Sequence, residues 1–541
     1  MKDISSTASF VDFTLENFIY VDKTEYIPKL VKLKRVFISR PRRFGKSLTL
    51  DTIGTLFEKG VEPYFKDTWI YDKRTEPTYP VFRLSFLNLD NSSLDLFKKQ
   101  LNSIISEFAN KINVKGYVKK TEPEDSILSL LEKLEEETRQ IVILIDEYDY
   151  QLTSNINNDA LYKQFQQKIK RFYANIKDKF AIKFLGITGV TRLKDVEIFS
   201  IGSDINDITN CSPYSQMIGF TRDEIKKYYI DYLKLAASYE NNCTVDNVTD
   251  TQIESMLDRL AQNYDGYCFD EFYKKKVFST WSVNSFFQSI VENKFVFFDE
   301  YWYDNGGLPS ILVNYLKTHE LNIFEYLDKD KFLKVSSDDL KNPTALTTIN
   351  QNVLMCQTGY LTLRSDLKKS STVLLGIPNG EIYKALNRLL ANNIFKGKAD
   401  VTDDQGKNLL EEGTVDDIIN LFNSALNSVS YDNYPIVSES SVQNMLKLYL
   451  LGAHQEVLSE VHEAKGRADL IVNTDIRRIV FEFKYAQNES EAKTKLSEAV
   501  EQIKSRDYGN ILPKKHELLR IAAVFNADPK VRAFTENQIV P

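Results

Sequence analysis

The stretch that most constrains the fold is an eight-residue loop, Arg40-Pro41-Arg42-Arg43-Phe44-Gly45-Lys46-Ser47. An apolar run, 36–38, precedes it and a helix-like run, 48–57, follows it. A strand that feeds a short loop and opens a helix with Gly-Lys-Ser is the construction of a P-loop, in which backbone N–H groups bind phosphates. Lys46 would then reach the β- and γ-phosphates, and the Ser47 hydroxyl would bind Mg²⁺. Because Arg40 stands where the general pattern has its first Gly, a basic turn on a solvated surface is the alternative.

A second motif follows about a hundred residues later. The continuous apolar run 141–145 is typical of a strand buried on both faces of a parallel sheet, and it ends in Asp146 and Glu147. Ligands of open α/β sheets bind at the carboxyl ends of the strands. Asp146 is therefore a candidate to hold Mg²⁺, and Glu147 to orient or deprotonate an attacking water. The two motifs together predict a nucleotide site.

Further motifs extend this pattern along the chain. RPRRFGKSL is preceded by YVDKTEYI and followed, in order, by ILIDEYD, GITGVTR, YDGY, QTGYLT and GIPN. This series resembles the AAA-ATPase-like family, whose members carry a PD-(D/E)XK nuclease-like domain at the C-terminus, and the resemblance extends from about Phe10 to about Tyr508. In that family Arg at the first Gly position is the rule. The resemblance therefore implies ATP and Mg²⁺ as cofactors, with the loop from Arg40 to Ser47 as the nucleotide-binding segment.

Composition bounds the class of protein. The chain has 541 residues, enough for several domains, and its 43% hydrophobic and 27% charged residues are those of a globular protein. Its four cysteines lie far apart, which argues against a zinc site or a disulfide framework. We find no membrane-spanning apolar run and no signal peptide, and we expect a cytoplasmic protein that does not bind membranes. Whether it forms a homo-oligomer stays open.

Alternating strands and helices in the N-terminal part predict an α/β fold, a doubly wound parallel sheet of the P-loop NTPase type. The strand-like run 180–187 leads to Thr188, our candidate for sensing the γ-phosphate, with Arg192 as a weaker one. From Thr221 the pattern becomes mainly helical, as in a lid. We expect a P-loop domain over 1–220, a helical lid over 221–345, a connecting segment over 346–430 and a nuclease-like domain over 431–541. Residues 396–408 are the most linker-like stretch.

The C-terminal region predicts a second site, on two strands joined by a short turn, 466–472 and 478–485. Because strand side chains alternate faces, Glu482 and Lys484 point the same way, and Asp469 lies on the neighbouring strand. Two carboxylates and a lysine at one place suit metal-assisted phosphodiester cleavage, with Asp469 and Glu482 holding Mg²⁺ and Lys484 steadying the transition state. Glu460 would add an acid and Gln502 a supporting polar group. This arrangement resembles the PD-(D/E)XK pattern of a restriction-endonuclease-like α/β domain.

These features support one leading hypothesis and two alternatives. The leading hypothesis is an ATP-binding and ATP-hydrolysing protein that couples its nucleotide state to a metal-dependent nuclease acting on DNA or RNA. Acidic and basic residues are nearly balanced over 431–541, so no basic surplus favours nucleic acid there. A regulatory NTPase whose nuclease-like domain only binds nucleic acid or protein is therefore the first alternative. The second is a scaffold that binds nucleotide without hydrolysing it.

Overall fold

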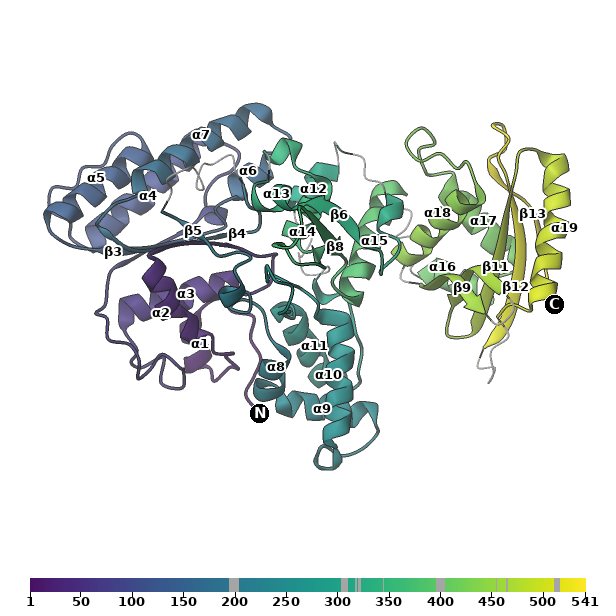
Figure 1. The fold of residues 1–541 in the computed structure, drawn as a ribbon, viewed down its shortest axis with the longest axis horizontal. Coiled ribbons are helices and arrows are strands. Elements are labelled where there is room, and N and C mark those ends of the chain that lie inside the picture. The colour runs from purple at the N-terminus through teal and green to yellow at the C-terminus, as the bar shows by residue number, and fades with distance from the viewer. Residues whose placement is uncertain are drawn as a thin grey trace. The chain divides into compact units, whose positions relative to one another are not determined.

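A parallel five-stranded sheet organises the N-terminal part of the computed structural model (Figure 1). Its order is β2-β3-β4-β1-β5, so β4 lies between the strand that feeds the Gly-Lys-Ser loop and the strand that ends in Asp146. The strands are β1 (Arg35–Ser39), β2 (Val81–Ser85), β3 (Ile141–Asp146), β4 (Ile182–Gly189) and β5 (Asn206–Asp207). The structure describes residues 1–193, 204–302, 310–316, 319, 323–343, 345–395, 404–453, 455–463, 466–509 and 516–541.

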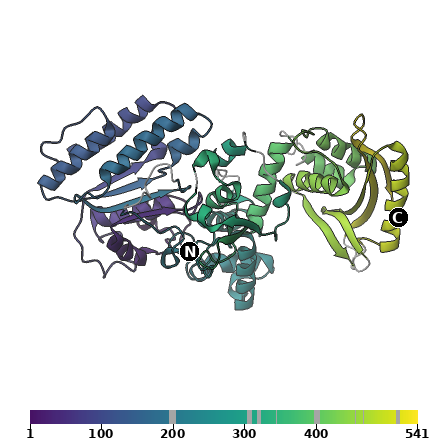
Figure 2. The same ribbon diagram turned by 45° about the horizontal axis from the view of Figure 1, so that its top comes forward.

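Helices cover both faces of this sheet, and Figure 2 shows the strands between the two layers. One layer contains α1 (Phe10–Leu15), α2 (Ile27–Leu33) and α3 (Lys46–Lys59); the other contains α4 (Leu94–Lys111), α5 (Pro123–Glu136) and α7 (Asp159–Ile176), which follows the short α6 (Tyr150–Ser154). The run 141–145 is completely buried between the layers, as its apolar sequence predicted. The expected doubly wound α/β architecture is confirmed.

A helical region follows, and its core is aromatic. The helices are α8 (Arg222–Tyr228), α9 (Ile230–Glu240), α10 (Asp250–Tyr264) and α11 (Thr280–Asn293). Tyr229 stacks on Phe287, and Phe286 stacks on Phe298. The chain then forms a small antiparallel sheet of order β6-β8-β7 that sequence periodicity had not indicated. The elements of this part are α12 (Ser310–Leu316), β6 (Leu333–Ser336), α13 (Ser337–Lys341), α14 (Gln351–Thr358), β7 (Thr362–Leu363) and β8 (Thr372–Gly376).

The C-terminal part contains a mixed sheet of order β13-β12-β11-β10-β9. Its strands are β9 (Glu456–Glu463), β10 (Gly466–Asn473), β11 (Arg477–Ala486), β12 (Glu517–Asn526) and β13 (Ala533–Ile539). As predicted, β10 and β11 form an antiparallel hairpin, whereas β11 and β12 run parallel. One face packs on α19 (Glu489–Arg506); the other carries α16 (Asp404–Glu412), α17 (Val415–Leu426) and α18 (Glu439–Gly452) (Figure 1).

The chain divides into two compact units, Met1–His319 with Phe332–Ile382, and Glu320–Lys331 with Tyr383–Pro541. The boundary falls inside helix α15 (Gly380–Ile394), so residues 346–382 pack with the first unit and 383–430 with the second. Our four-part division of the chain stays a proposal. The linker expectation was wrong for 404–408, which begin α16, while 396–403 lie outside the described residues. None of the helices in the described ranges combines the length and apolar character that crossing a bilayer requires.

Two candidate functional sites

The Gly-Lys-Ser loop connects β1 to α3 with two left-handed residues, Arg43 (φ 67°) and Gly45 (φ 95°). An added Cβ at Gly45 would have ample space, so the positive φ is what favours glycine at this position. Lys46 begins the helix, and its ammonium group donates to the carbonyl oxygens of Arg40 (3.0 Å) and Pro41 (2.8 Å). Burial lowers the pKa of Lys46, and the nearby carboxylate of Asp146 partly opposes this effect. The lysine is thus held inside the loop, where a phosphate anion would stabilise its charged form.

Three side chains meet at the carboxyl ends of the central strands. Asp146 accepts hydrogen bonds from the hydroxyl groups of Ser47 (2.5 Å) and Thr188 (2.6 Å). Thr188 reaches it because β4 lies directly beside β3. Ser47 and Asp146 provide oxygen atoms of the kind that Mg²⁺ prefers in a nucleotide site. The residues present therefore fit a magnesium ion. Thr188 lies beside them, and its role in sensing the γ-phosphate stays a prediction.

Glu147 follows Asp146 in a left-handed backbone conformation (φ 48°) and lines the same cavity as Lys46 and Ser47. A non-glycine residue with positive φ costs conformational energy, so the surrounding structure must hold it in place. Burial raises the pKa of Glu147, and the adjacent Asp146 raises it further. A carboxylate with a raised pKa is a better proton acceptor near neutral pH than an ordinary one.

Two residues of the loop face away from the cavity. Arg40 is buried, donates to the carbonyl oxygens of Ser39 (2.9 Å) and Thr209 (2.6 Å), and lies 4.1 Å above the ring of Phe269. Burial lowers the pKa of Arg40 to about 9. Neither Arg40 nor Pro41 is among the residues that line the cavity, and the hydrogen bonds of Arg40 hold the loop from the side away from it. The assignment of the loop from Arg40 to Ser47 as the nucleotide-binding segment stays a prediction.

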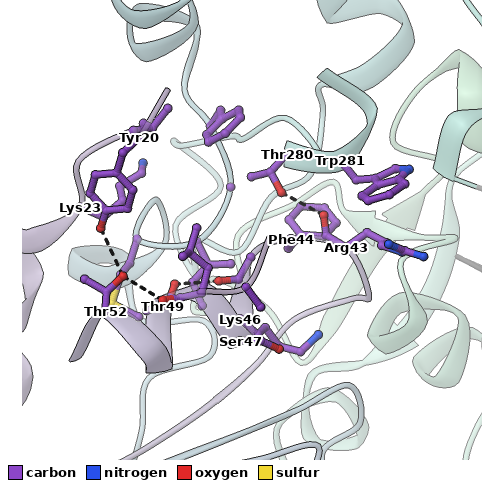
Figure 3. Close-up of a pocket in the computed structure, with 18 of the residues that line it drawn as sticks. Tyr20, Lys23, Arg43, Phe44, Lys46, Ser47, Thr49, Thr52, Thr280 and Trp281 are labelled. Atoms are coloured by element: carbon purple, nitrogen blue, oxygen red, sulfur yellow. Dashed lines mark hydrogen bonds between the residues drawn. The ribbon is translucent and has the colours of Figure 1, made fainter. Parts of the chain in front are cut away.

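The cavity beside the loop has a volume of about 480 Å³ (Figure 3). Phe44 through Ser47 form one side, with Arg42 and Arg43, and residues 19–21 and 23–24 form another. The guanidinium group of Arg43 lies 3.9 Å from the ring centre of Trp281, while the Arg43 carbonyl accepts from the Thr280 hydroxyl (2.9 Å). A volume of this size is within the range of small-molecule sites. Sequence periodicity did not identify Thr280 or Trp281, because their contact with the loop is long-range.

Arg192 lies elsewhere. Its Nε is 2.6 Å from Oδ2 of Asp207, and it donates to the carbonyl oxygen of Leu340 (3.5 Å). Arg192 does not line the nucleotide cavity, so its expected role near the γ-phosphate is not supported by its position. The neighbouring Thr191 links the segment after β4 to the segment after β3. Its backbone N–H donates to the buried carboxylate of Asp149 (2.7 Å), which follows β3.

The second site lies in the C-terminal unit, on β10 and β11. The Lys484 ammonium donates to Oε1 of Glu482 (2.9 Å), and Asp469 accepts from the backbone N–H of Phe483 (2.8 Å). The pairing of Leu470 with Phe481 makes Asp469 and Glu482 neighbours on adjacent strands. Glu482 is completely buried, and its Oε2 has no hydrogen-bond partner among the described residues. An unpartnered buried carboxylate oxygen next to a second carboxylate is a suitable ligand set for a divalent cation.

Burial and mutual repulsion govern the charges at this site. Burial raises the pKa of Asp469 to about 6, and burial together with Asp469 raises the pKa of Glu482 to about 7. Burial alone would lower the pKa of Lys484, but hydrogen bonding to Glu482 makes the net change a raised pKa. The carboxylates therefore need a further cation to be fully ionised near neutral pH.

Two residues of α18 join this site and were missed by the sequence reasoning. Glu439 lies 3.4 Å from the Lys484 ammonium, and Gln443, one helical turn later, is near enough to Asp469 to lower the pKa of that carboxyl. An acidic residue in the first turn of the helix before the hairpin was the available signal. Within the described residues, no group of three or more His, Cys, Asp or Glu has the arrangement of a metal centre.

Two further residues, Gln502 and Glu460, were predicted to support the C-terminal site. Gln502 donates to the hydroxyl of Tyr508 (3.4 Å), and within the described part of the chain it forms no hydrogen bond with Asp469, Glu482 or Lys484. Its expected support of the site is therefore indirect at most. Glu460 belongs to β9, but its side chain lies outside the described residues.

Comparison with known proteins shows a family match in the N-terminal part of the chain and another in the C-terminal part. Residues 5–199 match the family described as predicted AAA-ATPase, and residues 437–534 match the PD-(D/E)XK nuclease superfamily. An uncharacterized protein in the vnfD 5′ region of Azotobacter chroococcum mcd 1 is 25% identical over 543 residues, which cover 95% of this chain and 94% of that protein. The crystal structure of Cdc6p from Pyrobaculum aerophilum is 12% identical with a TM-score of 0.23, covering 68% of this chain and 93% of that chain.

Proposed function

We propose that this protein is a nuclease controlled by nucleotide. The proposal is based on a chain that joins an AAA-ATPase-like domain to a PD-(D/E)XK nuclease superfamily domain. The N-terminal site would bind ATP with Mg²⁺ and hydrolyse it. The C-terminal site would cleave phosphodiester bonds in DNA or RNA with a divalent metal, and the nucleotide state of the first site would control cleavage at the second.

At the N-terminal site, each residue has a role that follows from its contacts. Lys46 and the N–H groups at the start of α3 would bind the phosphates, and Ser47 and Asp146 would hold Mg²⁺, which neutralises phosphate charge. Thr188, hydrogen-bonded to Asp146, would sense the γ-phosphate. Glu147 would accept the proton of the water whose oxygen attacks the γ-phosphorus, while the bond to the β–γ bridging oxygen breaks.

At the C-terminal site, the observation that carries the proposal is the unpartnered Oε2 of Glu482 beside Asp469, with Lys484 bound to the other oxygen. Asp469 and Glu482 would hold a divalent metal, which would supply Lewis-acid activation of water and neutralise the phosphate. Lys484 would orient Glu482 and stabilise the negative charge that develops on the phosphate. Glu439 would position the Lys484 ammonium.

A regulatory NTPase with a binding-only C-terminal domain is the second candidate function. The near balance of acidic and basic residues over 431–541 favours the version of this function in which the C-terminal domain binds protein, because attraction to nucleic-acid phosphates normally requires a basic surplus. The basic pair Lys514 and Lys515 lies outside the described residues.

The deciding experiment is a cleavage assay on DNA and RNA with Mg²⁺ or Mn²⁺, with and without ATP. It compares the wild type with Glu482→Ala and with Glu498→Ala, a matched control on the exposed part of α19. We expect metal-dependent cleavage that changes with ATP, disappears in Glu482→Ala and persists in Glu498→Ala. If the wild type binds ATP yet cuts no substrate under any condition, the regulatory function replaces the nuclease.

A further inference from the structure

A second large cavity lies in the first unit, at the end of the parallel sheet opposite the Gly-Lys-Ser loop. Its volume is about 790 Å³, and its wall includes Arg35 and Ile182, the first residues of β1 and β4, and Gln140, which precedes β3. Ser47, Asp146 and Thr188 gather at the other ends of these strands. Since a strand rises about 3.3 Å per residue, the five residues of β1 separate the two ends by roughly 16 Å. The second cavity is therefore distinct from the candidate nucleotide site.

Positive charge is concentrated around this cavity, although the whole chain has a net charge of −7. Seven of the residues that line it are Lys or Arg, and three are Asp or Glu. Two of the carboxylates are already paired, Asp204 with Arg35 (2.8 Å) and Glu76 with Lys183 (3.2 Å). The third carboxylate is Asp178. Because the wall has seven basic and three acidic side chains, it carries an excess of positive charge. Such an excess at a concave surface attracts anions.

Several of these cations have no internal partner. Within the described residues, Lys32, Lys34 and Lys179 form no ion pair. Arg35 is buried and donates from Nη2 to the carbonyl oxygen of Lys179 (2.9 Å), while its buried Nε has no hydrogen-bond partner among the described residues. A buried donor without a partner is costly unless a ligand or water satisfies it. Arg35 therefore points to a ligand that accepts hydrogen bonds.

The cavity also has an apolar and aromatic part. Val31, Leu56, Phe57 and Ile70 contribute to its wall. Phe180 lines it as well, and 65% of its side chain is exposed, which is unusual for a phenylalanine. An exposed aromatic ring beside a cationic surface is the combination that binds a base by stacking and its phosphates by charge.

We propose that this cavity binds a small phosphorylated molecule with an aromatic base, that is, a second nucleotide. Its phosphates would lie against Arg35, Lys32 and Lys179, and its base against Phe180. The volume is within the range of about 300–1,000 Å³ that is typical of small-ligand sites.

The two cavities share walls, so a test must separate them. Helix α3 begins with Lys46 in the first cavity and brings Leu56 and Phe57 to the second, and Ile27 of α2 lines both. The full-length Lys46→Ala chain, in which binding at the first site is weakened, is therefore titrated calorimetrically with ADP, GDP, the dinucleotide pApA and inorganic tripolyphosphate. Circular dichroism verifies that each variant is folded.

The expected result is that at least one nucleotide binds the Lys46→Ala chain. Adding Lys32→Glu and Lys179→Glu should weaken that binding at least tenfold. The control is Lys29→Glu, which reverses one charge on α2 outside the cavity, half the charge change of the double variant, and should leave the affinity unchanged. In a chain with intact Lys46, a nucleotide that fits both cavities should bind with two molecules per chain, and with one after the double charge reversal.

Phe180→Ala distinguishes a base from phosphate alone. This exposed side chain can be removed with little effect on folding, and its loss should weaken nucleotide binding several-fold while tripolyphosphate binding stays the same. The proposal is overturned if none of the four probes binds the Lys46→Ala chain, or if the double charge reversal binds as tightly as the Lys29→Glu control. Equal binding of nucleotides by Lys46→Ala chains with and without Phe180→Ala would overturn the assignment of a base-binding site.

Discussion

The two candidate sites both combine carboxylates with a lysine, but they hold the lysine differently. In the N-terminal unit, Lys46 donates to two backbone carbonyl groups, and Asp146 accepts from the hydroxyl groups of Ser47 and Thr188. In the C-terminal unit, Lys484 donates directly to a carboxylate oxygen of Glu482.

This difference has consequences for what each site can bind. Burial lowers the pKa of Lys46 and nearby Asp146 opposes this only in part, so an added anion would stabilise the charged form of the lysine. Burial raises the pKa of Asp469 and Glu482, so their charged forms lack compensation and an added cation would stabilise them. The first site is suited to phosphate and the second to a divalent metal, although both contain the same types of side chain.

The largest effect is expected from Lys484→Ala, which removes the only cation that the described structure pairs directly with Glu482. Loss of transition-state stabilisation and of the orientation of Glu482 should slow cleavage by about 10²–10³-fold, with the fold intact by circular dichroism. The rate is measured on a labelled DNA or RNA substrate, with exposed Lys493→Ala as the control. Cleavage at the wild-type rate would remove the proposed site.

The next largest effect is expected from Lys46→Ala. Charge-assisted hydrogen bonds to two phosphates would be lost, so equilibrium titration with labelled ATP should show binding weakened about 100-fold. Lys59→Ala, at the other end of α3, removes the same charge outside the cavity and should bind normally. Unchanged affinity in Lys46→Ala would mean that the loop does not hold the phosphates.

The smallest effect is expected on the pH dependence of stability and concerns Glu381. Within the described residues this carboxylate is buried without a lysine beside it, so it shows how burial changes the pKa of such a group. It accepts from the Trp302 backbone N–H (2.8 Å) and the Ser282 hydroxyl (2.7 Å), and burial raises its pKa to about 8. The native state then holds a proton that the unfolded state releases, so this group stabilises the fold fully below its unfolded pKa of about 4.3. That stabilisation declines between about pH 4.3 and 8, by about 1.4 kcal/mol for each pH unit.

Glu381→Gln keeps the shape of the side chain and removes its titration. Denaturant unfolding at a series of pH values should therefore give a flatter pH dependence for Glu381→Gln than for the wild type, with the variant gaining relative stability as the pH rises from 5 to 8. Parallel curves for the two chains would show that Glu381 does not bind a proton in this range.

Local patterns in the sequence predicted much of the architecture and part of each site. The continuous apolar run before Asp146 predicted a doubly covered strand, and the alternation around Glu482 predicted the hairpin that brings this residue next to Asp469. The exposed or mixed patterns of β6–β8 and of α16 were weaker signals, and these elements were missed. Their stability depends on contacts with distant segments rather than on periodicity.

The sequence by itself determined which chemical groups are available and at which strand ends they emerge, because periodicity and turn residues are local properties. Only the tertiary structure decided where the side chains point. It turned Arg40 toward Thr209 and Phe269 instead of the cavity, and it placed Arg192 beside Asp207. It also brought Trp281 to the loop and Glu439 to Lys484. These directions depend on packing between segments that are 15 or more residues apart, and a local pattern contains no information about such contacts.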